Sequence, residues 1–161
     1  MKNEIPEYVS HTDCEICGFF GEKYRFLSNF YKTPVWYEGV LYPSSENAYQ
    51  AAKVDCDDRK DFLTCTPNES KKLWKSFHSI YTEESWDIAK FDIMSSVVFD
   101  KFVRSLGLRR KLIETGDRYL EETNHWSDST WGVNYKTKIG KNWLGIILMN
   151  TREFWKNKPM R

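Results

Sequence analysis

Apolar residues recur at helical spacing in two long stretches of the chain. The first series consists of Trp86, Phe91, Met94, Val98 and Phe102, and the second of Leu144, Ile147, Leu148, Thr151 and Trp155. Each series predicts an amphipathic helix whose apolar stripe packs into a core. We expect the first helix to follow Thr82 and to stop near Gly107, and the second to be capped by Asn142.

Three shorter helices are predicted from their end signals. Ser44 or Ser45 supplies an N-cap oxygen for the Ala-rich segment "ENAYQAAK". In "TPNESKKLW", Thr66 can cap, Pro67 suits the first turn and Glu69 completes a capping box. A further helix, "LRRKLIET", is expected to end at Gly116.

The strands are expected to be few and short. "VWYEGVLYP" is typical of two strands that turn at Glu38-Gly39, and "DRYLEET" and "TWGVNY" are short strands or extended loops. The sequence therefore predicts an α+β fold: a helix-dominated, compact single domain with a small antiparallel sheet. We expect a polar N-terminal arm over residues 1–18 and the domain over 19–161.

Bulk composition narrows the class of protein. The chain has 161 residues, of which 40% are hydrophobic and 16% aromatic, and this suffices for one substantial core. Lys+Arg 24 against Asp+Glu 23 gives a net charge of +1, so no global field draws the protein to nucleic acid or to an anionic membrane. The N-terminus lacks a continuous apolar signal segment and no stretch is long enough to span a bilayer, so we expect a cytoplasmic protein without a membrane partner.

The four cysteines are expected to be thiols, because no secretory signal precedes them. "HTDCEIC" places His11, Cys14 and Cys17 at a spacing that can begin a zinc site, with Cys56 or Cys65 as a further ligand. The second closely spaced pair that structural zinc sites usually have is missing. We therefore predict no metal.

"YPSSENAYQAAK", residues 42–53, is the first candidate for chemistry. Glu46, Tyr49, Gln50 and Lys53 fall on one helix face. Glu46 lies in the first turn, where the helix dipole and free N–H groups favour a negative charge, so its carboxylate should stay ionised. That suits an electrostatic stabiliser, a nucleophile or a base that activates water. The structural alternative is a capping glutamate.

Two aromatic-rich segments add polar candidates. "YRFLSNFY" carries Arg25, Ser28 and Asn29, and an Asn side chain there can bond sugar hydroxyls or simply form an Asx-turn. "NHWSDSTWGVN" is the second segment.

In that second segment, Asp128 and Asn134 lie among the indoles of Trp126 and Trp131. Two indoles near a carboxylate can hold a flat heterocycle. A loop whose tryptophans are buried in the core is the structural alternative for the same residues. We interpret His125 as an ordinary surface or capping residue.

"KIGKNWLG" places Gly140 and Lys141 just before a capped helix. Such a helix start can receive phosphate through backbone N–H groups and a lysine. The segment is not a Walker A sequence, and a simple Gly turn is the alternative that we prefer.

Four of these segments together resemble the NADAR (YbiA-like) family. They are "FLSNFY" (26–31), "YPSSENAYQAAK" (42–53), "SDSTWG" (127–132) and "GKNWLGIILMNTRE" (140–153), in the family's order. "WDIAKFDIMSSVVFDKF" extends the similarity over nearly the whole chain, from about residue 21 to 152. The resemblance implies a compact α+β N-glycosidase linked to NAD and ADP-ribose metabolism.

The resemblance also implies substrates and site residues. Some members of the family hydrolyse the ribosyl N-glycosidic bond of early riboflavin-pathway intermediates, and others remove ADP-ribose from guanine in nucleic acid. The family's motif residues fall on Asn29, Glu46 and Asp128. Two departures stand out: Val133-Asn134 replaces the Asp-Gly that many relatives have, and "SKKLWKS" replaces a small-residue/Arg/Gly stretch expected to contact phosphate.

The resulting hypothesis is hydrolysis by a carboxylate pair without metal or cofactor. Glu46 would stabilise the cationic sugar and orient water, and Asp128 would assist proton transfer to the base, by analogy with glycoside hydrolysis. Asn29, with Ser28, would hold ribose. The expected partner is a phosphorylated ribosyl nucleotide-like small molecule or ADP-ribosylated nucleic acid.

The other expected substrate contacts surround that pair. They comprise a base clamp of Trp126 and Trp131, phosphate contacts from Arg25, Lys53 and Lys141, and polar contacts from Gln50 and Asn134. Two alternatives stay open: a module that binds ADP-ribose or NAD without turnover, and a structural domain whose aromatic residues are all core. Protein partners are not predicted.

Overall fold

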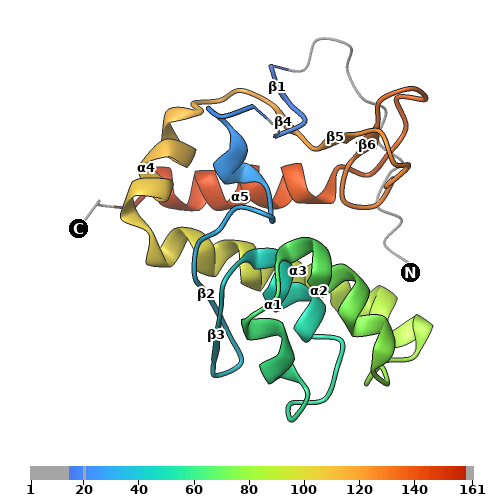
Figure 1. Cartoon of the computed structure of the whole chain (residues 1–161). Coiled ribbons are helices and arrows are strands. Elements are labelled where there is room, and N and C mark those ends of the chain that lie inside the picture. The colour runs from blue at the N-terminus through green and yellow to red at the C-terminus, as the bar shows by residue number, and fades with distance from the viewer. Residues whose placement is uncertain (1–14, 20, 159–161) are drawn as a thin grey trace. The chain divides into compact units, whose positions relative to one another are not determined.

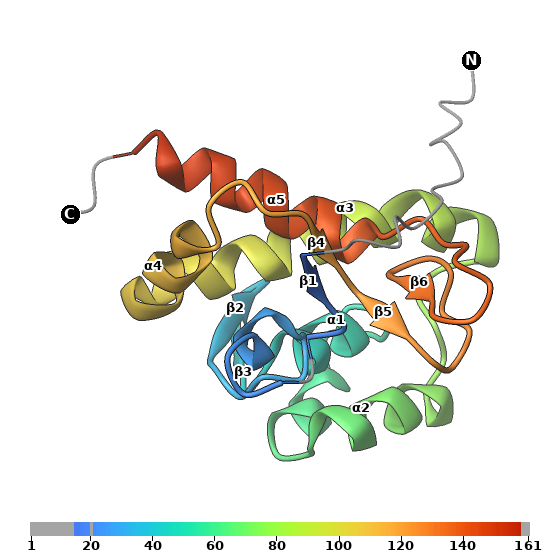
Figure 2. The same ribbon diagram turned by 90° about the horizontal axis from the view of Figure 1, so that it is seen from above.

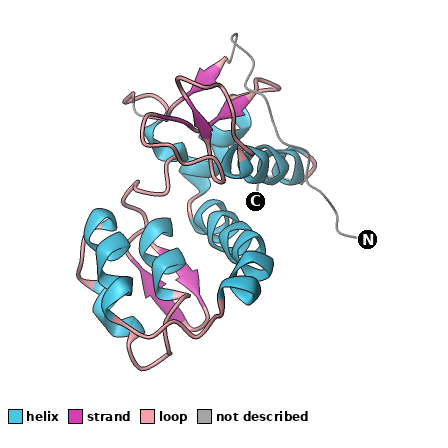
Figure 3. Cartoon of the chain, turned by 90° about the vertical axis from the view of Figure 1, so that its right-hand side faces the viewer, coloured by secondary structure: helices cyan, strands magenta, loops and turns pink. Residues whose placement is uncertain are grey.

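The structure, a computed structural model, describes residues 15–19 and 21–158. Helices dominate, as Figures 1 and 3 show, and the strands of the described residues are two or three residues long. The chain divides into two compact units: residues 1–27 with 110–161, and residues 28–109. The predicted boundary between an arm and a domain at residue 18 stays a prediction, because most of that arm lies outside the described residues.

The second unit, residues 28–109, is built on one antiparallel hairpin and a set of helices. Its elements are β2 (Val35–Tyr37), β3 (Val40–Tyr42), α1 (Ser45–Ala51), η2 (Arg59–Leu63), α2 (Pro67–Leu73), η3 (Trp74–Ser76) and α3 (Glu83–Arg104). The hairpin turns at Glu38 and Gly39, both with positive φ, as predicted. α1 packs on α2 and α3, and α3 also packs on β2.

The first unit combines the chain ends. Its elements are β1 (Ile16–Cys17), η1 (Arg25–Leu27), most of α4 (Leu106–Glu114), β4 (Leu120–Glu121), β5 (Thr123–Asn124), β6 (Val133–Asn134) and α5 (Trp143–Lys156). β1 pairs with β4 and β5 with β6, both in parallel, and Figure 2 shows β6 beside β5. α5 packs against β4. The α+β class is thus confirmed, whereas one of the three strand pairs in the described part of the chain is antiparallel and two are parallel.

Helix starts agree closely with the local sequence signals. Ser44 caps α1, its oxygen accepting the N–H of Asn47. Thr66 and Glu69 form the predicted capping box of α2, with Pro67 in the first turn. Thr82 begins α3.

The end of α3 was predicted too late. The helix ends at Arg104, because Ser105 adopts an extended backbone and its Oγ accepts the N–H of Leu108, which lies in the first turn of α4. Gly107 therefore lies inside α4 rather than at a helix end. A serine that caps the next helix outweighs the glycine as a stop signal.

Candidate functional site

Glu46 lies in the first turn of α1, as its sequence predicts. Its backbone N–H donates to the carbonyl of Asn29 at 3.0 Å, and the residue is only 7% exposed. Its carboxylate Oε1 accepts a hydrogen bond of 2.7 Å from Gln50 Nε2, and Gln50 Oε1 accepts one of 2.7 Å from Lys53 Nζ. The polar stripe of the helix is therefore one connected hydrogen-bond chain that ends on a buried carboxylate.

Lys53 is surrounded by aromatic rings. Its ammonium lies 4.3 Å from the ring centroid of Trp74 and 5.1 Å from those of Tyr49 and Trp86, distances at which cation–π attraction operates. Burial lowers the pKa of Lys53 to about 8; the charge of Glu46 opposes this shift, and nearby lysines add to it. Lys53 lies just beyond the end of α1, rather than on its face as predicted, and its positive charge is linked to the Glu46 carboxylate through Gln50.

Asn29 presents a buried acceptor next to Glu46. The residue is 7% exposed, and its Nδ2 donates to Met94 Sδ at 3.2 Å. Its Oδ1 has no hydrogen-bond partner. A buried polar atom without a partner is costly, so this carbonyl is well suited to accept a hydroxyl from a ligand.

Asp128 organises a loop of the first unit. Its Oδ1 accepts the N–H groups of Thr130 and Trp131 at 3.0 and 2.9 Å. Asn124 holds the main chain of Asp128 through both ends of its amide. These two bonds hold the carboxylate in place through Oδ1 and do not use Oδ2.

The remaining predicted contacts of the first unit divide between exposed and packed side chains. Trp126 is 53% exposed, whereas Trp131 packs edge-on against Trp143 with ring centroids 5.6 Å apart. Asn134 accepts two N–H groups of its own turn and donates to Ser127. Arg25 is exposed on η1. Their roles toward a substrate stay predictions.

The start of α5 is not the phosphate-receiving turn considered from the sequence. The N–H groups of Lys141, Asn142, Trp143 and Leu144 donate to the carbonyls of Ser129, Gly132, Thr130 and Trp131, respectively. Because these donors are used internally, the simple turn is the better interpretation. The Lys141 ammonium lies 4.9 Å from the Trp143 ring centroid.

Asn142 precedes α5 with a left-handed backbone (φ 49°) and makes no capping bond. Its amide instead donates to Tyr119 Oη and the Leu120 carbonyl and accepts the N–H of Glu122. The predicted role as a side-chain cap is therefore wrong. Asn142 ties the start of α5 to the β4 strand and the residue that follows it.

The sequence profile of the NADAR domain matches residues 18–155 of the chain. The chain belongs to the NADAR domain family. It is 30% identical to the N-glycosidase YbiA of Escherichia coli (strain K12) over 155 residues, which are 95% of this chain and 89% of YbiA. It is 32% identical to an N-glycosidase of Nostoc punctiforme over 141 residues, covering 84% of this chain and 88% of that protein.

A longer relative and a solved structure add to this NADAR assignment. A riboflavin biosynthesis protein of Vibrio vulnificus is 32% identical over 134 residues, and the chain spans only 36% of its length. The NMR structure of E. coli YbiA superposes with a TM-score of 0.74 at 27% identity, covering 91% of this chain and 89% of YbiA. These matches confirm the predicted family, the α+β fold and the class of enzyme, a hydrolase of N-glycosyl bonds.

In this NADAR domain, the two halves of the predicted site lie on different units. Ser28, Asn29, Glu46, Gln50 and Lys53 belong to the second unit. Asp128 belongs to the first, together with the other predicted contacts, Arg25, Trp126, Trp131, Asn134 and Lys141. The structure brings Asn29 and the α1 stripe together, and the pairing of Glu46 with Asp128 stays a prediction.

Sequence reasoning missed three side chains around the α1 stripe. Trp74 and Trp86 flank Lys53, and Lys101 on α3 is buried beside Ser28. The signal for Lys101 was its place on the apolar face of α3, three residues after Val98. Trp74 and Trp86 carried no such signal, because tryptophans on helices usually belong to the core.

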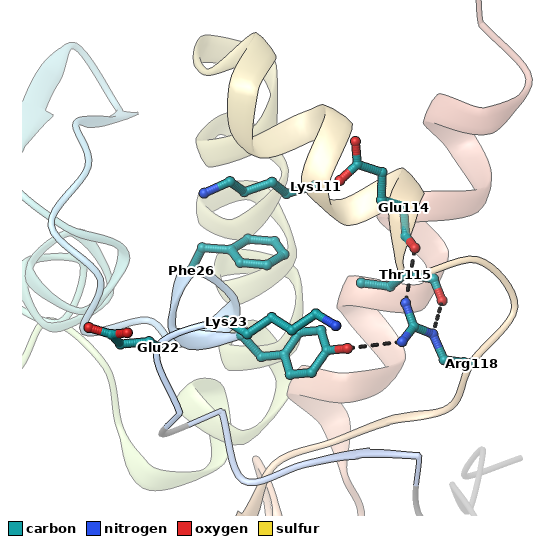
Figure 4. A pocket seen from close by; sticks show the side chains of 8 residues that line it. Glu22, Lys23, Phe26, Lys111, Glu114, Thr115 and Arg118 are labelled. Atoms are coloured by element: carbon teal, nitrogen blue, oxygen red, sulfur yellow. Dashed lines mark hydrogen bonds between the residues drawn. The ribbon is translucent and has the colours of Figure 1, made fainter.

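A cavity of about 270 Å³ opens between η1 and the end of α4 (Figure 4). Arg118 occupies one corner, where it donates to the carbonyls of Thr115 and Glu114 and to Tyr24 Oη. Burial raises the pKa of Tyr24, but hydrogen bonds with Lys23 and Arg118 outweigh this effect and bring the pKa below its usual value. None of the residues lining this cavity is among the predicted site residues.

The cysteines differ from the expectation of four thiols. Cys17 is disulfide-bonded, whereas Cys56 and Cys65 are free. A disulfide sulfur is not a thiolate ligand, and the other two residues of the zinc hypothesis, His11 and Cys14, lie outside the described residues. Within the described ranges, the one grouping with metal-ligand geometry is the exposed Asp55, Cys56 and Asp57. In the same part of the chain, no helix is both long and apolar enough to cross a membrane.

Proposed function

We propose that this protein hydrolyses the N-glycosidic bond between ribose and a nitrogen base in a phosphorylated ribosylamino-pyrimidine of the riboflavin pathway. The observation that carries the proposal is a buried carboxylate, that of Glu46, on a residue whose main-chain N–H bonds to Asn29, the residue that carries the unpartnered side-chain Oδ1. The N-glycosidase names of two relatives support the type of bond, and the name of the Vibrio vulnificus relative, a riboflavin biosynthesis protein, supports the substrate class. ADP-ribosylated guanine in nucleic acid is the second candidate substrate.

Cleavage of a ribosyl C–N bond builds positive charge on the sugar as the base departs. Glu46 supplies a fixed negative charge for this cation and orients the attacking water. The hydrogen bond from Gln50 holds the carboxylate oxygen in one position. Asn29 accepts a ribose hydroxyl through Oδ1, and this fixes the sugar relative to Glu46.

The departing base must gain a proton. Asp128 assists that transfer, because its loop fixes the carboxylate through Oδ1 and leaves Oδ2 for the base. The ammonium of Lys53 attracts the substrate phosphate, and the lysines of α2 and η3 that lower its pKa add to the positive field. Hydrolysis changes no oxidation state, so the reaction needs no redox cofactor, and the proposed mechanism assigns no step to a metal.

Product chromatography after incubation with each candidate substrate tests the proposal. Wild-type protein is expected to release free base from the ribosylamino-pyrimidine phosphate. Glu46→Gln should slow release by at least about 100-fold, the scale of positioned acid–base groups, while ligand affinity changes little. Glu84→Gln is the matched control, because Glu84 also lies in a first helical turn but is exposed.

Each other result has a distinct meaning. Release from ADP-ribosylated guanine alone would replace the substrate and keep the chemistry. Saturable binding without base release would show a binding module instead of an enzyme. Equal rates for Glu46→Gln and wild type would remove Glu46 from the mechanism.

A further inference from the structure

Lys101 is a buried amine on α3. It is 1% exposed, and its Nζ donates to the Ser28 carbonyl at 2.8 Å. The aromatic rings of Tyr31 and Phe102 lie 5.7 and 5.5 Å from the ammonium. Among the described residues, no carboxylate forms an ion pair with it.

Stability alone favours an apolar side chain at this position. Val97 and Val98, both buried, precede Lys101 by four and three positions and therefore lie on the same face of α3. Removing an amine from water without a charged partner is costly, and burial lowers the pKa of Lys101 to about 7. A methionine would fill similar space at no such cost, so the hydrogen bond that Lys101 makes must serve another purpose.

That hydrogen bond holds the turn that carries Asn29. The Ser28 carbonyl accepts both Lys101 Nζ and the N–H of Tyr31, and Ser28 Oγ accepts the N–H of Phe30. The main-chain carbonyl of the next residue, Asn29, accepts the N–H of Glu46. A continuous path of bonds therefore leads from the Lys101 amine through this turn to the first turn of α1.

We propose that Lys101 is a positioning residue that locks the Ser28–Tyr31 turn, so that Asn29 Oδ1 points at a ribose hydroxyl of the substrate. The proposal rests on the function assigned to Asn29 above. Lys101 itself does not touch the substrate. Loss of the Lys101 amine loosens the turn and weakens the binding of ribose. It does not change the step carried out by the carboxylates.

The test compares Lys101→Met with wild type by steady-state kinetics and by NMR. Lys101→Met is expected to stay folded and to raise KM for the ribosyl substrate about tenfold with a smaller change in kcat, the loss expected for one hydrogen bond. Added to Asn29→Ala, it should cause no further loss, because both act through the same contact. Lys90→Met is the control: it removes an ammonium of the same helix that is paired with Asp87.

The NMR arm does not depend on catalysis. The Asn29 side-chain amide resonances of the ligand-free protein should shift or broaden in Lys101→Met and stay unchanged in Lys90→Met. Lys101→Arg retains a hydrogen-bond donor. Its Asn29 resonances should therefore match those of wild type, and its KM should lie close to the wild-type value. If Lys101→Met does not fold, the Lys101→Arg spectrum is the deciding measurement: wild-type Asn29 resonances support the positioning role, and shifted resonances contradict it.

Several results would overturn the positioning role. Wild-type resonances and KM in Lys101→Met would do so, as would additive losses in the double variant with Asn29→Ala. A wild-type KM for Lys101→Met together with a raised KM for Lys101→Arg would also overturn it. If wild-type protein releases no base, the proposed function fails, yet the resonances of Asn29 still decide whether Lys101 holds the turn.

Discussion

At the scale of single residues, Glu46 and Lys101 show what the sequence could and could not predict. The position of Glu46 in the first turn of a helix was predicted from neighbouring residues, because a Ser cap and the helix period are local features. The hydrogen bonds from Asn29 Nδ2 to Met94 and from Lys101 Nζ to Ser28 join residues more than 60 positions apart. Such contacts depend on tertiary packing, which no local pattern encodes.

The buried amine of Lys101 predicts how stability responds to pH. Its pKa falls from 10.5 in the unfolded chain to about 7 in the folded protein. Between these values the unfolded state binds the proton that the folded state lacks, so the free energy of unfolding rises with pH through this window. Below about pH 7 both states are protonated, and the burial penalty is present in full.

Urea unfolding of wild type and Lys101→Met from pH 6 to pH 9 measures this effect. The variant lacks the titrating group, so its stability advantage over wild type should be largest at pH 6 and should shrink as pH rises. Other titrating groups cancel in the difference. A difference independent of pH would show that Lys101 keeps its ordinary pKa in the folded protein.

At the scale of elements, prediction worked where helix signals are contiguous. The capping box of α2 needs only Thr66 and Glu69, and both bonds are present. The two parallel strand pairs could not be predicted, because each strand is only two residues long, and in one pair the strands β1 and β4 are also far apart in sequence. Gly132 shows the same limit: a Cβ there would lie 2.0 Å from the Glu122 carbonyl oxygen, a contact that only the fold creates.

The start of α5 gives a stability prediction at this scale. Asn142→Ala should destabilise the protein by about 3 kcal/mol, because it leaves the Glu122 N–H and Leu120 carbonyl without their buried partner. Asn157→Ala, which removes an exposed amide at the other end of α5, should cost less than about 1 kcal/mol. Thermal unfolding of both variants measures the difference, and equal losses would contradict the tie between α5 and β4.

At the scale of the whole molecule, the chain folds as a NADAR domain whose predicted site residues are contributed by two compact units. Length, composition and the ordered segments were enough to predict the fold class and the family. The joint action of Glu46 and Asp128 could not be derived from spacing, because 82 positions separate them in sequence (128 − 46). This joint action is the central claim of the proposed mechanism.

A double-mutant cycle on Glu46→Gln and Asp128→Asn tests that claim most directly, with single-turnover base release from the ribosylamino-pyrimidine phosphate as the readout. Two carboxylates that act on one bond should be strongly non-additive, so the double variant should be little slower than the slower single variant. Losses that multiply, or a wild-type rate for Asp128→Asn, would contradict the paired mechanism.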